Sequence, residues 1–143
     1  MSTLPQFLQS GSGVALTSAD LDSLKRRDRP RVLVARGSRM RTKAALLNEV
    51  SAVLQFPLDF GDNWDALADS LGDLDQLGGQ ALVVLGVAQA EQVLADEAGA
   101  FGTFVAVLAD RGVQVLLAVS DDADGPAVRS AWAAAGLTVE ALA

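Results

Sequence analysis

The sequence contains no cysteine and no histidine. Without cysteine the chain can form no disulfide, and without either residue it lacks the usual ligands of transition metals. Nearly every nucleophile–base pair used in covalent catalysis also needs one of these two residues. Catalysis would have to rest on carboxylates, Lys, Arg or hydroxyl groups alone. We therefore expect a protein that is not an enzyme and that holds no metal and no cofactor.

Long apolar runs are missing as well. No stretch reaches the ~20 apolar residues that span a bilayer, although half of the residues are hydrophobic. Residues 1–13 lack the basic segment followed by an apolar stretch that marks a secretory signal. These absences predict a cytoplasmic protein that does not bind membranes. A length of 143 residues predicts a single domain.

Positive charge dominates residues 1–43, and negative charge dominates residues 44–143. Residues 1–43 carry nine Lys or Arg against three acids, a net charge of +6, whereas residues 44–143 carry fifteen acids against two Arg, a net charge of −13. The acidic part suits a basic protein partner and not a nucleic acid. We interpret the basic cluster as a solvated edge and not as a nucleic-acid patch, because no aromatic residue or binding module accompanies it. Its members are Lys25, Arg26, Arg27, Arg29, Arg31, Arg36, Arg39, Arg41 and Lys43.

Apolar strand signals alternate with helical patterns along the chain. Continuous apolar runs predict strands at 31–35, 81–85 and 113–119, with an additional edge strand at 137–142. Apolar spacing and capping residues predict helices at 18–27, 44–54, 63–74, 89–95, 97–111 and 127–135. Residues 1–13 are expected to form a loosely ordered lead-in. This alternation is typical of βαβ units, so we predict an α/β fold with a parallel sheet.

The segment from Phe56 to Leu74 holds five aspartates and no basic residue. At helical spacing its large apolar side chains share one arc, and Asp65, Asp69 and Asp73 form a ridge on the flank. Asp62 or Asn63 can cap such a helix, and Asp65 then lies in the first turn, where the helix dipole favours an acid. The other two acids gain nothing from the dipole and repel one another at i, i+4. The ridge therefore indicates a role outside the stability of the helix.

The pattern F-P-x-x-F-G-x-N-W-D-A-L-x-D-x-L at residues 56–71 resembles the signature of the barstar family, intracellular inhibitors of barnase-type ribonucleases. The resemblance runs from about residue 32 to residue 120. It implies a small three-stranded parallel sheet with packed helices. On this basis we divide the chain into a barstar-like core at about 31–120, an N-terminal lead-in at 1–30 and a C-terminal extension at 121–143.

The resemblance also implies which residues meet a partner. Asp69 falls on the central acid that meets the phosphate-binding Arg and Lys groups of the enzyme, and Asp65 on a second acid of the same face. Three positions depart from the family pattern: Asp59 replaces an aromatic residue, Ala68 a tryptophan, and Val107 an acid. We interpret Phe56, Phe60 and Trp64 as core residues. The predicted partner-binding residues are Asp59, Asp62, Asn63, Asp65, Ala68, Asp69, Gly72, Asp73 and Leu74.

Three functions are compatible with these features. The resemblance implies an inhibitor that is a monomer when free and that blocks the active site of a basic microbial ribonuclease with its acidic helix. An immunity or regulatory module against a different basic partner would share the same surface. A carboxylate-dependent enzyme, or a Mg²⁺ site at Asp62, Asp65 and Asp69, is disfavoured because no second element with ligands or a paired nucleophile is evident.

Overall fold

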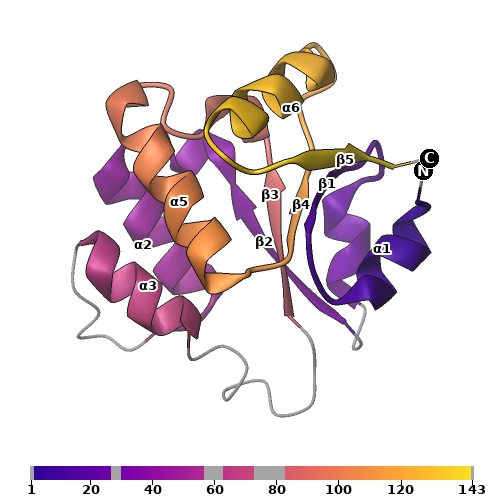
Figure 1. The fold of residues 1–143 in the computed structure, drawn as a ribbon, viewed down its shortest axis with the longest axis horizontal. Coiled ribbons are helices and arrows are strands. Elements are labelled where there is room, and N and C mark those ends of the chain that lie inside the picture. The colour runs from indigo at the N-terminus through magenta and orange to yellow at the C-terminus, as the bar shows by residue number, and fades with distance from the viewer. Residues whose placement is uncertain (1, 27–29, 57–62, 73–82, 143) are drawn as a thin grey trace.

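Five parallel strands form a single sheet at the centre of the protein (Figure 1). The computed structural model describes residues 2–26, 30–56, 63–72 and 83–142. The strands follow the order β2-β3-β4-β1-β5 across the sheet. Their bounds are β1 Val14–Leu16, β2 Arg31–Arg36, β3 Val83–Ala88, β4 Val115–Leu117 and β5 Val139–Ala141.

The expectation of a parallel α/β fold is confirmed, but the expectation of three strands in the sheet is wrong. Three of the five strands match the predicted ones, and β5 is the predicted edge strand. The additional strand, β1, pairs with β4 on one side and with β5 on the other. It has only three residues, Val14–Leu16, which is too short to show a strand pattern in the sequence.

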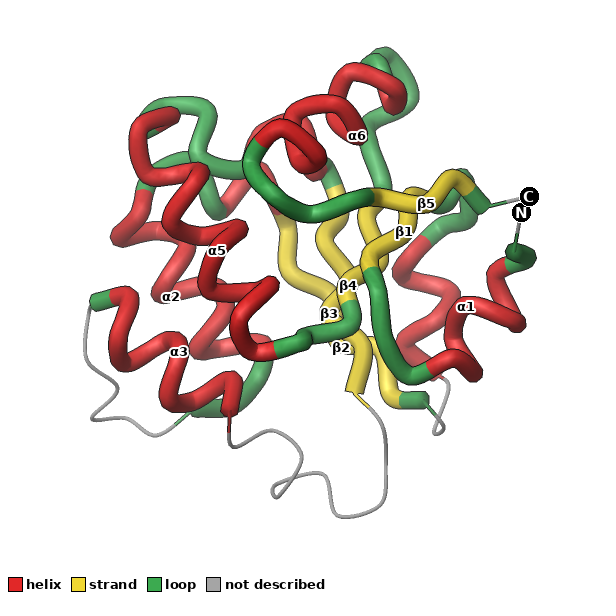
Figure 2. Tube along the Cα trace, in the orientation of Figure 1, coloured by secondary structure: helices red, strands yellow, loops and turns green. Residues whose placement is uncertain are grey.

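Helices cover both faces of the sheet (Figure 2). The α-helices are α1 Leu4–Ser10, α2 Lys43–Val53, α3 Trp64–Gly72, α5 Phe101–Arg111 and α6 Gly125–Ala134. Short 3₁₀ helices are η1 Leu21–Arg26, η2 Gly37–Arg39, η3 Ala90–Gln92 and η4 Ala98–Ala100. The predicted helix at 18–27 is thus the 3₁₀ helix η1, and the predicted helix at 89–95 is reduced to one 3₁₀ turn.

The expectation of a loosely ordered lead-in at 1–13 is also wrong. Thr3 and Gln6 form a capping box at the start of α1, Pro5 lies in its first turn, and Gly11 ends it with φ +78°. Phe7 and Leu8 are buried. The Gln114 side chain fixes the helix by donating a hydrogen bond to the Phe7 carbonyl oxygen at 2.7 Å.

Alternating side chains of the strands build two separate cores. Val32, Val34 and Leu116 pack with α1 and η1 on one face. The residues next to these in the strands, such as Ala35 and Leu117, pack on the other face with α2, α3, α5 and α6. This alternation is the two-residue period of a strand that is buried on both faces. The acidic helix α3 thus rests on a core that extends across most of the protein.

Candidate functional site

Asn63 fixes the start of helix α3. Its side-chain Oδ1 accepts a hydrogen bond from the backbone N–H of Ala66 at 2.7 Å, and its carbonyl oxygen accepts one from Leu67 at 3.2 Å. This is the geometry of an N-cap residue, so of the two predicted candidates, Asp62 and Asn63, the structure shows Asn63 in this role. Asp65 therefore lies in the first turn of the helix. Capping of α3 is therefore a sufficient structural reason for the asparagine at position 63.

One side of α3 is anchored in the core. Leu67 and Leu71 are buried, and the half-buried Trp64 packs against the same core. The Trp64 ring lies 6.1 Å from the ring of Phe104 on α5, centroid to centroid, and the Lys43 ammonium lies 5.5 Å from its centroid. Phe56 is also buried, so its interpretation as a core residue is confirmed, whereas Trp64 is only partly buried at the edge of the core. Phe60 lies outside the described residues.

The opposite side of α3 presents the acids to solvent. Asp65 and Asp69 are exposed, and Ala68 between them is half-buried. Within the described part of the chain, neither carboxylate has an ion pair or a hydrogen bond. We call Asn63, Asp65, Asp69 and Gly72 the acidic face. Asp59, Asp62, Asp73 and Leu74, the other predicted acids and the predicted final contact, lie outside the described residues.

Arg111 borders the acidic face, and the sequence reasoning did not single it out. A Cβ atom added at Gly72 would lie 3.3 Å from Arg111 Nη1 and 3.8 Å from its Cδ, so the arginine side chain passes close over this glycine. Its Nε lies 3.7 Å from Oδ2 of the sequence neighbour Asp110. The sequence nevertheless marks this residue, because Arg111 is one of only two basic residues after position 43.

The basic N-terminal part of the chain forms local ion pairs. Arg36 Nη2 donates to both carboxylate oxygens of Asp22 at 3.0 Å, and Lys25 lies 3.0 Å from the same side chain. The hydrogen bonds from Arg36 and Lys25 hold the pKa of Asp22 below its ordinary value. Arg41 pairs with Asp96 in the same way at 2.9 and 3.0 Å. Three of the basic residues thus form ion pairs at the surface, which is compatible with a solvated edge.

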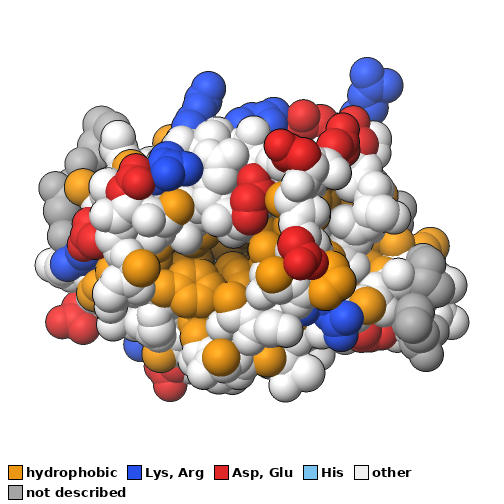
Figure 3. All heavy atoms as spheres, turned by 90° about the horizontal axis from the view of Figure 1, so that it is seen from above, with side chains coloured by type: hydrophobic (Ala, Val, Ile, Leu, Met, Phe, Trp, Pro, Cys, Tyr) orange, Lys and Arg blue, Asp and Glu red, His pale blue; other side chains and the backbone are white. Residues whose placement is uncertain are grey.

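A separate apolar groove of about 540 Å³ lies between α6 and residues 90–101. Figure 3 views the molecule from above and shows hydrophobic side chains gathered in a hollow of this face. Phe101 and Trp132 line the groove, with their rings 5.6 Å apart. Its two carboxylates have structural roles, because Glu91 accepts hydrogen bonds from Ser120 and Asp124 caps α6. We assign no function to this groove.

Comparison with known families identifies the family to which the chain belongs. A family model described as Barstar (barnase inhibitor) matches residues 30–127, which include the whole acidic face. The chain belongs to the barstar family. Among curated proteins, none matches it. In the described part of this barstar-family chain, no helix combines the length and apolar character needed to cross a membrane.

Solved structures show the same overall fold in larger proteins. A chain in the structure of Drosophila ORC bound to AT-rich DNA and Cdc6 is 15% identical to the barstar-family chain, with a TM-score of 0.59. Cdc6p from Pyrobaculum aerophilum is 16% identical, with a TM-score of 0.56. The matches cover 96% and 97% of this chain but only 50% and 42% of those chains. At this identity the likeness concerns the fold alone.

Two departures from the family pattern can be located in the structure. Ala68 is half-buried on α3 and presents a methyl group where the resemblance implies a tryptophan. Val107 is half-buried on α5 and packs against the core, where the resemblance implies an acid. Next to the acids, the barstar-family chain thus has a methyl group at Ala68, and the Arg111 side chain lies close to Gly72 at the end of the same helix.

Proposed function

We propose that this protein inhibits a small basic ribonuclease by placing the acidic face of α3 in the active site of the enzyme. The observation that carries the proposal is the pair of exposed carboxylates, Asp65 and Asp69, on a helix of a barstar-family chain whose other side is fixed in the core. The protein would act without chemistry of its own, as a monomer, in the cytoplasm of the cell that makes the enzyme.

The physical basis is substitution of phosphate by carboxylate. A ribonuclease binds RNA phosphates with Arg and Lys side chains, and aspartate carboxylates accept the same charge-assisted hydrogen bonds. Asp65 and Asp69 have no cationic partner among the described residues, so no internal ion pair has to break before they bind. The burial of Leu67 and Leu71 holds the helix in place, which lowers the entropy lost on association.

The net charge of −13 over residues 44–143 adds long-range attraction toward a basic enzyme. Because the Debye length shortens from about 10 Å at 0.1 M salt to about 3 Å at 1 M, this attraction is screened by salt. The association rate constant should therefore fall strongly with ionic strength, whereas the dissociation rate constant should change much less.

The test is stoichiometric inhibition across a panel of barnase-type and related guanyl-specific ribonucleases. Purified protein is titrated into each enzyme while cleavage of a fluorescent RNA substrate is followed. We expect a one-to-one end point with at least one enzyme, and a complex of the same stoichiometry in analytical ultracentrifugation. Absence of inhibition across the panel would favour the alternative, an immunity or regulatory module against a different basic partner. A pull-down eluted with high salt would then identify that partner.

A further inference from the structure

Two neighbouring strands, β1 and β4, continue into connections that lie on opposite faces of the sheet. β1 and β4 are adjacent and parallel, with Leu16 opposite Leu117 at their carboxyl ends. After β1 the chain passes to η1, which packs with α1 on one face. After β4 it passes to α6, whose Val128 and Trp132 belong to the core on the other face. In open parallel sheets, such a divergence leaves a crevice that binds ligands.

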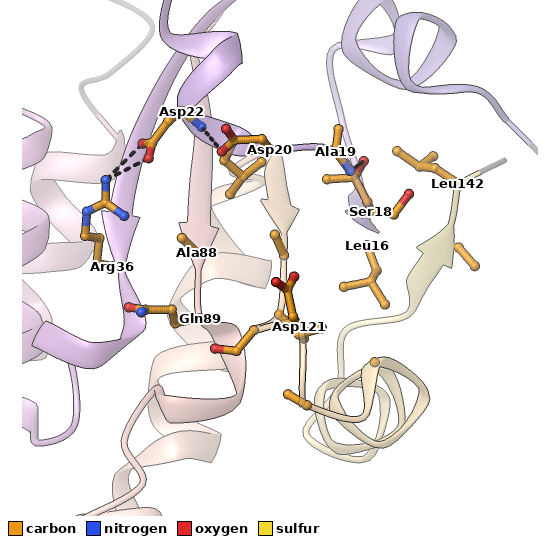
Figure 4. A pocket seen from close by; sticks show the side chains of 18 residues that line it. Leu16, Ser18, Ala19, Asp20, Asp22, Arg36, Ala88, Gln89, Asp121 and Leu142 are labelled. Atoms are coloured by element: carbon orange, nitrogen blue, oxygen red, sulfur yellow. Dashed lines mark hydrogen bonds and ion pairs between the residues drawn. The ribbon is translucent and has the colours of Figure 1, made fainter.

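The structure has a cavity of about 600 Å³ at this place (Figure 4). That volume lies within the range of small-molecule sites, roughly 300–1,000 Å³. Leu16 and Leu142 supply apolar walls, and Ser18 supplies a hydroxyl group. Figure 4 shows Asp20 and Asp121 reaching the crevice from separate segments of the chain. No residue of α3 lines the cavity, so this crevice is distinct from the acidic face.

The charged residues that line the cavity indicate which class of ligand it would bind. Among the described lining residues the basic one is Arg36, which donates to both carboxylate oxygens of Asp22 at 3.0 Å, and Asp22 is shared with Lys25 just outside the lining. Asp20 accepts a hydrogen bond from the Asp22 backbone N–H at 3.1 Å. Neither Asp20 nor Asp121 has a cationic partner within the described part of the chain. With three aspartates in the lining against Arg36 and the adjoining Lys25, the cavity keeps a net negative charge, and its apolar walls come from residues such as Leu16 and Leu142.

A phosphate ligand does not fit this lining. Phosphate sites at the end of a first strand use a glycine-rich loop and a lysine that follow the strand. Here the residues after β1 are Thr17, Ser18, Ala19 and Asp20, and the glycines Gly11 and Gly13 precede the strand. An anion would be repelled by the net negative charge of the lining.

We propose that the crevice between the β1–η1 and β4–α6 connections binds a small organic cation, an ammonium or guanidinium group on a short apolar body. Asp20 and Asp121 would hold the cationic group, and Leu16 and Leu142 would pack against the apolar body. The proposal does not depend on ribonuclease inhibition, because the two surfaces share no residue. The strands β1 and β5, which lie outside the family match at 30–127, form part of this site.

The experiment uses the full chain, uniformly labelled with ¹⁵N, and follows backbone amide shifts during titration. The probes are n-butylammonium and n-butylguanidinium, with n-butanol as the neutral match and AMP as the anion. We expect saturable shifts at residues 17–22 and 118–123 with the two cations, and binding at least roughly fivefold weaker with n-butanol. Asp20→Asn and Asp121→Asn should each weaken cation binding about twofold to fivefold. Asp122→Asn is the matched control, because it removes the same charge from a neighbour that does not line the cavity.

Several outcomes would overturn the proposal. They are the absence of saturable shifts with either cation, equal binding of n-butanol, tighter binding of AMP, and an effect of Asp122→Asn as large as that of Asp121→Asn. Asp20→Asn keeps an oxygen that can accept the Asp22 N–H bond, so its fold should be preserved. Amide spectra of each free variant verify this before titration.

Discussion

Asp69→Ala separates a functional acid from a structural one, because folding and binding should change in opposite directions. Asp69 is exposed, lies beyond the first turn of α3, and has Asp65 four residues before it. Alanine has the higher helix propensity, worth up to about 0.7 kcal/mol, and removal of the i, i+4 repulsion adds about 0.3 kcal/mol. We therefore expect the free energy of unfolding of the free protein to rise by about 0.5–1 kcal/mol.

In the complex the same substitution should be costly. It removes one partner of a desolvated charge pair and leaves the basic groups of the enzyme unpaired, a change that generally costs about 3–5 kcal/mol. Urea unfolding of the free protein and titration of the ribonuclease measure the two effects on the same variant. Damage to a scaffold residue lowers the stability of the free protein. It would therefore not give a variant that is both more stable and a weaker inhibitor.

Two further variants make the result specific. Asp65→Ala should weaken binding but raise stability less than Asp69→Ala does, since the loss of the favourable helix dipole in the first turn offsets the same gains. Asp122→Ala removes the same charge from an exposed turn far along the chain, and should leave inhibition almost unchanged. The reasoning is refuted if Asp69→Ala unfolds more readily yet inhibits as well as the wild type. It is also refuted if Asp122→Ala weakens inhibition as much as Asp69→Ala does.

Three other predictions concern residues around the site and in the scaffold. Arg111→Glu should alter which ribonucleases of a panel are inhibited while leaving urea unfolding within about 0.5 kcal/mol, because Arg111 is exposed at the edge of the acidic face. Gly37→Ala should destabilise the protein by about 2 kcal/mol or more in urea unfolding, since its Cβ would lie 1.9 Å from the Gln89 carbonyl oxygen. Burial would raise the pKa of Glu91, but hydrogen bonds from Ser120 hold it below its ordinary value of 4.5. The resulting stability is present above pH 4.5 and is lost as the pH falls through the lower folded pKa. Wild type should therefore exceed Glu91→Gln in stability at pH 7, and the difference should shrink during acid titration.

The acidic helix could be predicted from the sequence because its determinants are local. Asn63 as the cap, the spacing of Leu67 and Leu71, and the solvent side of Asp65 and Asp69 all follow from the helical period. Helix α1 has local determinants too, since Thr3 and Gln6 have capping-box spacing and Pro5 precedes Gln6. The serines and glycines around this helix are typical of a loop and outweigh that signal in the sequence.

The rest of the fold depends on contacts between distant segments. β1 is stabilised by β4 and β5, which follow about 100 or more residues later, and three residues carry too little pattern to predict a strand. Arg111 approaches Gly72 only because α5 packs beside α3. The crevice is lined by segments around residues 20, 36, 88, 120 and 141, so no local spacing could reveal it.

The treatment of charge differs between the two parts of the chain, and this difference bears on function. In the basic part, Lys25 and Arg36 share Asp22, and Arg41 is paired with Asp96, in each case at the surface. On the acidic face, Asp65 and Asp69 have no cation within 4.0 Å among the described residues. A fold selected for stability alone could place a lysine four residues from either acid, for a few tenths of a kcal/mol. Since no such pairing occurs among the described residues, Asp65 and Asp69 remain accessible to the cationic partner that the proposed inhibition requires.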